Sequence, residues 1–286
     1  MHTSTARRSL SLSAVVAASA LALTGCGLMP EEEQAIGTEN DDGTVTLTVA
    51  ASPVPHAQIL QFIDENLAAD EGLDIEIEEY SGYAEQNQAL EAGDVDANYF
   101  QHEPYLEAEV EANGYDFEHF SGVHIEPFAL FSNSLDDIED LPEGAQVGIN
   151  NDPSNQGRGL ALLQEAGVIT LEEGVDPADA AINDVAENPK DIEFVEAEAA
   201  SLARTLDDVD AAVINGNNAL ENDLSPTEDS LLVEDGQDSP YANFLTVRAG
   251  DEEDENIQAL DELLHSDEVR SYIEDTWPDG EVQAAF

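Results

Sequence analysis

Residues 150–163 read NNDPSNQGRGLALL and combine turn-forming residues, a cation and the start of an apolar helical face. Asp152 is a candidate N-cap with Pro153 at the first helical position, and either of the two polar residues that follow is a candidate for a later cap. A helix start offers free backbone N–H groups and the positive end of the helix dipole, to which Arg158 adds a two-pronged donor. The stretch therefore suits a carboxylate, either that of a ligand or that of an acidic residue of the chain.

The composition around this stretch is intensely acidic. The 286 residues include 65 Asp and Glu but only 7 Lys and Arg, and two of the seven, Arg7 and Arg8, lie near the N-terminus. With a net charge of −58 and no basic patch, the surface repels nucleic acid, so no nucleic-acid partner is expected. Such a surface is typical of a protein that works in high salt, where screening reduces the self-repulsion.

The N-terminus predicts export and a lipid anchor. Residues 1–25 have the pattern of a signal peptide, with Arg7 and Arg8 before an uncharged small-residue segment. The LTGC that ends at Cys26 resembles the lipobox of bacterial lipoproteins, whose cysteine is lipidated, with palmitate among the expected acyl groups. Both ordinary secretion and twin-arginine export remain open. Residues 26–43 then predict a flexible acidic tether, so we expect a protein held at the cell membrane by lipid and facing outside the cytoplasm.

Strands and helices alternate along the rest of the chain, which predicts an α/β protein. We expect strands near residues 44–50, 73–80, 97–100, 122–131, 146–150, 192–197 and 211–214, and helices near 56–68, 84–91, 104–112, 153–163, 201–206, 255–264 and 267–275. The length suggests two lobes. Lobe 1 is expected to comprise residues 44–131 and 248–286, and lobe 2 residues 132–247.

Polar and aromatic residues gather where strands are expected to end. DANYFQHEPY, residues 96–105, brings Phe100 and His102 to a strand-to-helix corner, which suits a pocket for a small, partly apolar molecule. Tyr83 lies near another such end, and Asn215 follows the buried strand AAVI. The structural alternatives are an ordinary core corner for the aromatic group and a simple turn for Asn215.

The histidines raise the alternative of a metal site, formed by His56, His102, His119 and His124 with Glu126. Their spacings match no strong metal motif, so we expect no metal and no other cofactor. The sequence also lacks a glycine-rich phosphate loop, a GxSxG sequence and a Cys/His dyad. We therefore expect a binding protein rather than an enzyme, with a hydrolase that uses acidic residues as the least favoured alternative.

Four segments together resemble the NlpA-type lipoproteins, the methionine-binding proteins of ABC uptake systems. The segments are residues 96–106, 150–169, 187–216 and 238–248, and the resemblance runs in order from about Val45 to the C-terminus. It implies a two-lobed periplasmic-binding-protein-like fold of type II, a Venus flytrap that closes around one amino acid. It also implies docking on an ABC permease and its ATPase.

The resemblance further implies a role for each site residue. Arg158 would bind the carboxylate of L-methionine with help from Asn155, and Asn215 would reach the amino and carboxylate end from the same lobe. A polarizable sulfur packs favourably against aromatic rings. The opposite wall, around the thioether, would be formed by Tyr83, Phe100 and His102.

The side-chain specificity is less fixed than the carboxylate contact. Some family members have an aromatic residue where this chain has Glu126, whereas others share its HxEP form. D-methionine, a methionine derivative, another amino acid and a short peptide are therefore alternative ligands in the same fold. A metal-scavenging lipoprotein that uses the histidines is the alternative of a different class.

Overall fold

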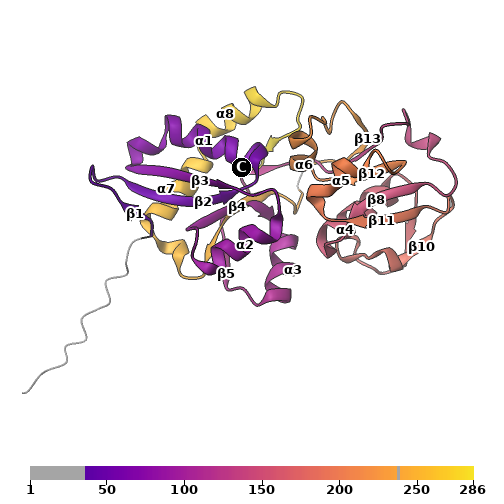
Figure 1. Ribbon diagram of the computed structural model, residues 1–286, viewed down its shortest axis with the longest axis horizontal. Helices are drawn as coiled ribbons and strands as arrows, with labels where there is room; N and C mark the ends of the chain where they lie inside the picture. The colour runs from indigo at the N-terminus through magenta and orange to yellow at the C-terminus, as the bar shows by residue number, and fades with distance from the viewer. Residues whose placement is uncertain (1–35, 237–238) are drawn as a thin grey trace, which may run out of the picture. The chain divides into compact units, whose positions relative to one another are not determined.

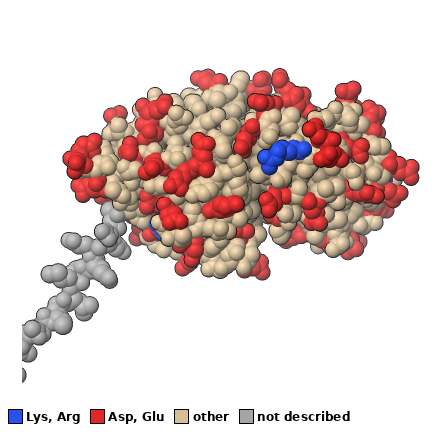
Figure 2. Space-filling view, viewed as in Figure 1, with Lys and Arg blue, Asp and Glu red and all other residues tan. Residues whose placement is uncertain are grey.

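The computed structural model describes residues 36–236 and 239–286, which form two large β-sheets with helices packed against them, and one small two-stranded sheet (Figure 1). The signal peptide expected at residues 1–25 and the lipidation expected at Cys26 lie outside the described residues. Within the described part of the chain, no helix is both long and apolar enough to cross a membrane. Figure 2 shows Asp and Glu side chains spread over the face in view, with few cationic side chains among them.

The first sheet is built from both ends of the sequence. Strand β2 pairs in parallel with β3 and β4, and β14 joins β4 in antiparallel orientation from late in the chain. The eight strands are β1 Thr38–Glu39, β2 Val45–Ala51, β3 Leu73–Glu79, β4 Ala97–His102, β5 Phe117–His119, β6 His124–Ile125, β14 Asn243–Arg248 and β15 Gln283–Ala284.

The second sheet has the strand order β11-β8-β12-β7-β13. Strand β8 lies between β11 and β12 and is parallel to both, whereas β7 is antiparallel to β12 and β13. The strands are β7 Ala129–Phe131, β8 Gln146–Asn150, β11 Glu193–Ala197, β12 Ala211–Ile214 and β13 Ser230–Val233. A separate antiparallel pair consists of β9 Thr170–Leu171 and β10 Val185–Glu187.

Helices pack on both faces of each sheet because successive side chains of a strand point to opposite faces. In β2, Leu47 packs with α1, α7 and α8, whereas Ala50 packs on the other face with Leu90 of α2. In β12, Val213 packs with α4 and Ile214 with α5.

The helices are α1 Gln58–Asn66, α2 Tyr83–Ala92, α3 Glu103–Asn113, α4 Pro153–Glu165, α5 Ala199–Thr205, α6 Gly216–Glu221, α7 Glu255–Leu264 and α8 Asp267–Thr276. Short helical turns are η1 Pro53–Ala57, η2 Ala68–Glu71, η3 Ile138–Asp140, η4 Pro177–Asp179, η5 Ile182–Asp184 and η6 Asp251–Glu253. Together with the family comparison reported below, these layers agree with the predicted two-lobed α/β fold.

The predicted tether, residues 26–43, is wrong in its C-terminal part. Ile36 packs against the core of the first sheet, and its backbone N–H donates to the Asp254 carboxylate at 2.9 Å. Strand β1 pairs with β2, and the Asn40 N–H donates to the Thr44 carbonyl to close the turn between them. Hairpin pairing with the neighbouring strand β2, together with the distant contacts of Ile36, fixes this segment despite its acidic composition.

The single strand expected over residues 122–131 is also wrong. This segment forms two short strands, β6 in the first sheet and β7 in the second. Strand β6 pairs with β14 and β15 in the first sheet, whereas β7 pairs with β12 in the second. Pro127 lies between them and has no N–H with which to continue a ladder. The chain therefore passes between the sheets after β6 and again before β14, a few residues earlier than the lobe boundaries expected at 131/132 and 247/248.

Candidate functional site

A cavity lies at the carboxyl ends of β4, β8 and β12, the edge at which α/β sheets of this kind bind ligands. It is lined by all six residues predicted for the ligand site: Tyr83, Phe100, His102, Asn155, Arg158 and Asn215. The lining is completed by Gln101, Tyr105, Glu126, Gly216, Asn217 and Asn243. The free space between these side chains is about 10 Å³, which is room for about one water molecule. The structure thus brings the six residues together, and their role as ligand contacts stays a prediction.

Helix α4 presents Arg158 to this cavity. Asp152, the first of the candidate caps in the sequence, is the N-cap, and its Oδ1 accepts the Asn155 backbone N–H at 2.9 Å while Pro153 occupies the first helical position. The same Asp152 oxygen accepts from the Asn155 side-chain amide at 3.0 Å. The cap therefore fixes both the helix start and the orientation of Asn155. Arg158 follows on the same helix and is only 5% exposed.

The Arg158 guanidinium contacts a carboxylate and two aromatic rings. Its Nε and Nη2 donate to the Glu234 carboxylate, with 2.5 Å between Nη2 and Oε2, and Nη2 also donates to the Glu126 backbone carbonyl at 3.1 Å. The guanidinium carbon lies 4.2 Å from the ring centre of Tyr241 and 4.9 Å from that of Phe128. The expected alternative, a pairing of Arg158 with an acid of the chain, is therefore present. None of these contacts uses Nη1, so that nitrogen remains for another acceptor.

Hydrogen bonds join His102, Asn155 and Asn215 across the cavity. His102 is the N-cap of α3, and its Nδ1 accepts the Tyr105 N–H at 3.2 Å, so Nε2 carries the proton and donates to Asn155 Oδ1 at 3.3 Å. Asn215 Nδ2 donates to the same oxygen at 2.8 Å. Burial, with the nearby Arg158 acting in the same direction, lowers the pKa of His102 to about 3. At neutral pH, His102 therefore supplies a hydrogen-bond donor but no charge.

An aromatic wall closes another side of the cavity. The ring of Tyr83 lies 5.7 Å from the rings of both Phe100 and Tyr105, centre to centre. The Tyr83 hydroxyl donates to Asn217 Oδ1 at 2.7 Å and accepts from Asn218 Nδ2 at 2.8 Å, which links α2 to α6. Burial raises the pKa of Tyr83 well above its usual range, so the hydroxyl stays protonated. The wall offers ring faces to an apolar side chain.

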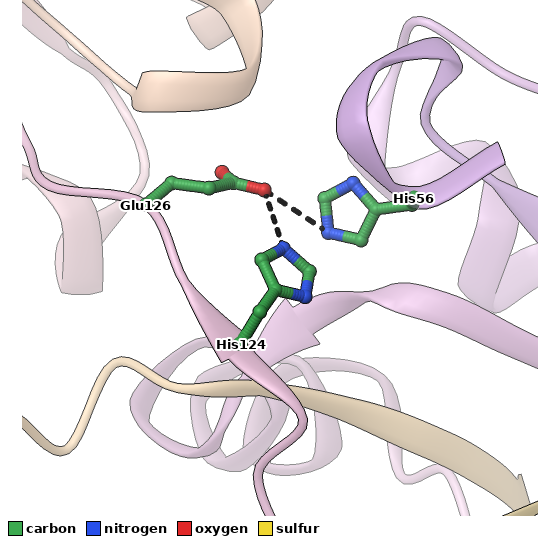
Figure 3. Close-up of side chains that lie close together, drawn as sticks. All are labelled: His56, His124 and Glu126. Carbon is green, nitrogen blue, oxygen red and sulfur yellow. Dashed lines mark hydrogen bonds and ion pairs between the residues drawn. The ribbon is translucent and has the colours of Figure 1, made fainter. Parts of the chain in front are cut away.

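Of the five residues considered above for a metal site, the structure brings three together: His56, His124 and Glu126. All three are buried, and within the described residues they form a group whose ligand atoms lie within 4.8 Å of one another (Figure 3). Two imidazoles and a carboxylate do occur as zinc ligands. Here they already bond to one another and to the chain: His124 Nε2 lies 2.8 Å from Glu126 Oε1, and His124 Nδ1 bonds to the Tyr99 hydroxyl.

Several residues around the site were not predicted from the sequence. Gly216, Asn217 and Asn243 line the cavity, whereas Phe128, Glu234 and Tyr241 contact Arg158. The sequence held a pointer to some of them, since Gly216 and Asn217 directly follow Asn215, and both Tyr241 and Asn243 belong to the segment DSPYANFLTVR. Glu234 had no signal, because it stands among other acids of a polar stretch.

Comparisons with known proteins identify relatives along almost the whole chain. The model of the NlpA lipoprotein family matches residues 47–286. The methionine-binding lipoprotein MetQ of Bacillus subtilis is 40% identical over 260 residues, which cover 89% of this chain and 93% of that protein. The D-methionine-binding lipoprotein MetQ of Escherichia coli K12 is 37% identical over 252 residues, covering 87% of this chain and 88% of its own length.

A solved structure gives the same result for the fold. A nutrient-binding protein from Burkholderia cenocepacia bound to methionine superimposes with a TM-score of 0.80 at 39% sequence identity, covering 84% of this chain and all of that one. The resemblance seen in the sequence is therefore confirmed. The chain belongs to the NlpA lipoprotein family, a family of two-lobed substrate-binding proteins and not of enzymes.

Proposed function

We propose that this protein captures methionine outside the cytoplasm and delivers it to an ABC permease and its ATPase. The observation that carries the proposal is the placement of a buried guanidinium, Arg158, in one cavity with the aromatic wall of Tyr83 and Phe100. A guanidinium recognises a carboxylate, and ring faces suit a thioether. The relatives named above as methionine-binding support the choice of this amino acid.

In the proposed complex, the ligand carboxylate accepts a hydrogen bond from Arg158 Nη1. Asn155 and Asn215 supply further contacts at the same end of the ligand. Because the free space is only about 10 Å³, the ligand enters when the two lobes separate. Separation breaks the hydrogen bonds Tyr83–Asn217 and His102–Asn155, which join residues attached to different sheets. Closure around methionine would form a surface that the permease recognises.

A competition assay tests the ligand. Labelled L-methionine bound to the purified protein is challenged with the other amino acids, D-methionine, methionine derivatives and short peptides. We expect L-methionine and its close derivatives to displace the label, whereas amino acids without a thioether do not. Displacement by a different amino acid or a peptide at lower concentration would transfer the proposal to that ligand. The same experiment ranks the two enantiomers.

The lipid anchor is a separate part of the proposal, and it rests on the LTGC sequence that ends at Cys26. Cells that express the protein are grown with labelled palmitate and then fractionated. The wild-type chain should carry the label and sediment with membranes, whereas Cys26→Ala should carry none. Equal labelling of both proteins would contradict lipidation at this residue.

A further inference from the structure

A buried carboxylate beside the cavity has no role in the proposed methionine contacts. The Glu126 side chain is 6% exposed, and those of His56 and His124 are fully buried. Figure 3 shows both imidazoles turned toward the same carboxylate oxygen. His124 Nε2 lies 2.8 Å from Glu126 Oε1 and His56 Nε2 lies 3.4 Å from it. The other oxygen, Oε2, accepts the backbone N–H of Asn217 at 3.1 Å.

The groups that contact the Glu126 carboxylate itself, two imidazoles and a backbone N–H, hold it in place but carry no positive charge. Burial lowers the pKa of His56 to about 4 and that of His124 to about 3, so both imidazoles are neutral at pH 7. Arg158 donates to the backbone carbonyl of Glu126, and its ion pair is with Glu234. Among the described residues, no Lys or Arg forms an ion pair with the Glu126 carboxylate. A buried carboxylate in this position favours a cationic partner, because an uncompensated buried charge is costly.

Glu126 and Arg158 line the same cavity, and one bond joins them, from Arg158 Nη2 to the Glu126 carbonyl. An α-amino acid carries its ammonium group on the carbon next to its carboxylate, so it presents opposite charges at short spacing. We infer that the Glu126 carboxylate, oriented by His124 and His56, receives the α-ammonium of the ligand while Arg158 receives its carboxylate. This inference rests on the proposed function and adds that the site selects ligands with a free α-amino group.

The second sheet also positions Glu126. Gly216 lies so close that a Cβ at this position would meet the Cβ of Glu126 at 2.6 Å, and Asn217 donates its N–H to the carboxylate from the first turn of α6. Both residues follow Asn215, which the proposed function places at the same end of the ligand. The ammonium contact would therefore form where β6 and its sheet meet the start of α6.

A proton on His56 Nε2 favours orientation of the Glu126 carboxylate over metal binding. His56 Nε2 lies 3.0 Å from Asn243 Oδ1, and Asn243 Nδ2 donates to the Tyr241 carbonyl, which fixes the amide orientation. The imidazole nitrogen nearest the carboxylate therefore faces two acceptors and carries a proton. A metal ligand needs a lone pair at that atom. The cluster is thus arranged as donors that hold a carboxylate.

The test compares two ligands on two proteins, the detergent-solubilised full chain and its Glu126→Gln variant. L-methionine is compared with 4-(methylthio)butanoate, which keeps the carboxylate and thioether but lacks the amino group. Wild-type protein should bind L-methionine more tightly by about 10- to 100-fold, the usual range for a charge-assisted contact. In Glu126→Gln the ratio of the two affinities should fall towards one, because L-methionine binding weakens while binding of the analogue is unchanged or stronger. His119→Gln, at an exposed imidazole, should keep the wild-type preference.

Three results would overturn the inference. The first is a Glu126→Gln variant that keeps the wild-type preference or weakens both ligands equally. The second is wild-type protein that binds both ligands equally, and this result needs no folded variant. The third is L-methionine binding that disappears with chelator and returns with Zn²⁺. Wild-type protein that binds no methionine at all would instead contradict the proposed function on which the inference rests.

Discussion

Arg158 on α4 and Glu234 just after β13 form an ion pair in which two guanidinium nitrogens donate to one carboxylate, with 2.5 Å between the closest atoms. The pair is largely buried, since the Arg158 side chain is 5% and the Glu234 side chain 17% exposed. Glu234 also accepts the Phe128 N–H at 3.2 Å. The proposed carboxylate receptor is therefore oriented by an acid of the chain, which occupies one edge of the guanidinium and leaves Nη1 for the ligand.

Glu234→Gln should tighten methionine binding. A ligand carboxylate on Nη1 lies near the Glu234 carboxylate, and removing that like charge relieves repulsion of about 1 kcal/mol, which corresponds to about fivefold in affinity. The amide oxygen can still accept one of the Arg158 hydrogen bonds. Glu228→Gln, at an exposed acid, serves as the matched control. Weaker binding in calorimetry would show that orientation of Arg158 by Glu234 outweighs the repulsion.

Arg158→Ala should weaken methionine binding by at least about 2 kcal/mol, because it removes a buried charge-assisted contact. It also leaves the Glu234 carboxylate without its cation, so stability falls as well. The double variant Arg158→Ala/Glu234→Gln separates the two effects, since it should recover stability but not affinity. Arg204→Ala, at an exposed arginine, is the control. Unchanged affinity in Arg158→Ala would reject the site assignment.

Acid should destabilise the fold below about pH 6.5. Burial lowers the pKa of His56, His102 and His124 to about 4, 3 and 3, so between these values and 6.5 the unfolded chain binds more protons than the folded chain. Stability is therefore fully present above the unfolded pKa and is lost as pH falls. At about pH 5 the loss is about 2 kcal/mol per histidine. Burial raises the pKa of Glu126, and this acts in the opposite direction.

Urea unfolding at constant high salt measures this dependence. The free energy of unfolding should fall from about pH 7.5 to about pH 5 in the wild-type chain and in His119→Gln. His124→Gln should show a shallower slope, because one of the three buried imidazoles is gone. A free energy of unfolding that does not change over this range would contradict neutral buried histidines.

Salt should stabilise the protein by screening its surface charge. The chain carries a net charge of −58, and Asp and Glu side chains are spread over the face shown in Figure 2. Raising NaCl from about 0.1 M to about 1 M shortens the Debye length from about 10 Å to about 3 Å, which reduces repulsion between neighbouring carboxylates. The melting temperature followed by circular dichroism should rise over this interval, equally in NaCl and KCl. A flat or falling melting temperature would reject adaptation of the surface to high salt.

The helix at the centre of the site could be predicted from local signals. Asp152 followed by Pro153 is a helix-start pattern, and the structure has this cap at this position. Asn215 follows a short apolar strand, and the strand ends as predicted at Ile214. Caps and strand ends depend on neighbouring residues, so the helix start and the strand end could be placed from one sequence. The grouping of Asn155, Arg158 and Asn215 in one site was implied by the family resemblance and not by these local signals.

The partners of Arg158 could not be predicted, because they depend on distant pairing. Glu234 lies 76 residues after Arg158 and is one acid among many until β13 places it beside β7. The same limit applies to Ile36, whose N–H reaches Asp254 across 218 residues. The division of residues 122–131 between β6 and β7 likewise follows from which distant strands each half pairs with, and a local apolar run does not contain that information.

The most direct test of the central claim is a calorimetric titration of residues 27–286 with L-methionine in high salt. The protein is first unfolded and refolded, so that any ligand carried through purification is removed. The account predicts one-to-one binding with a dissociation constant in the micromolar range or tighter. A folded protein that gives no heat, and whose melting temperature does not change with L-methionine, would contradict methionine capture while leaving the two-lobed fold intact.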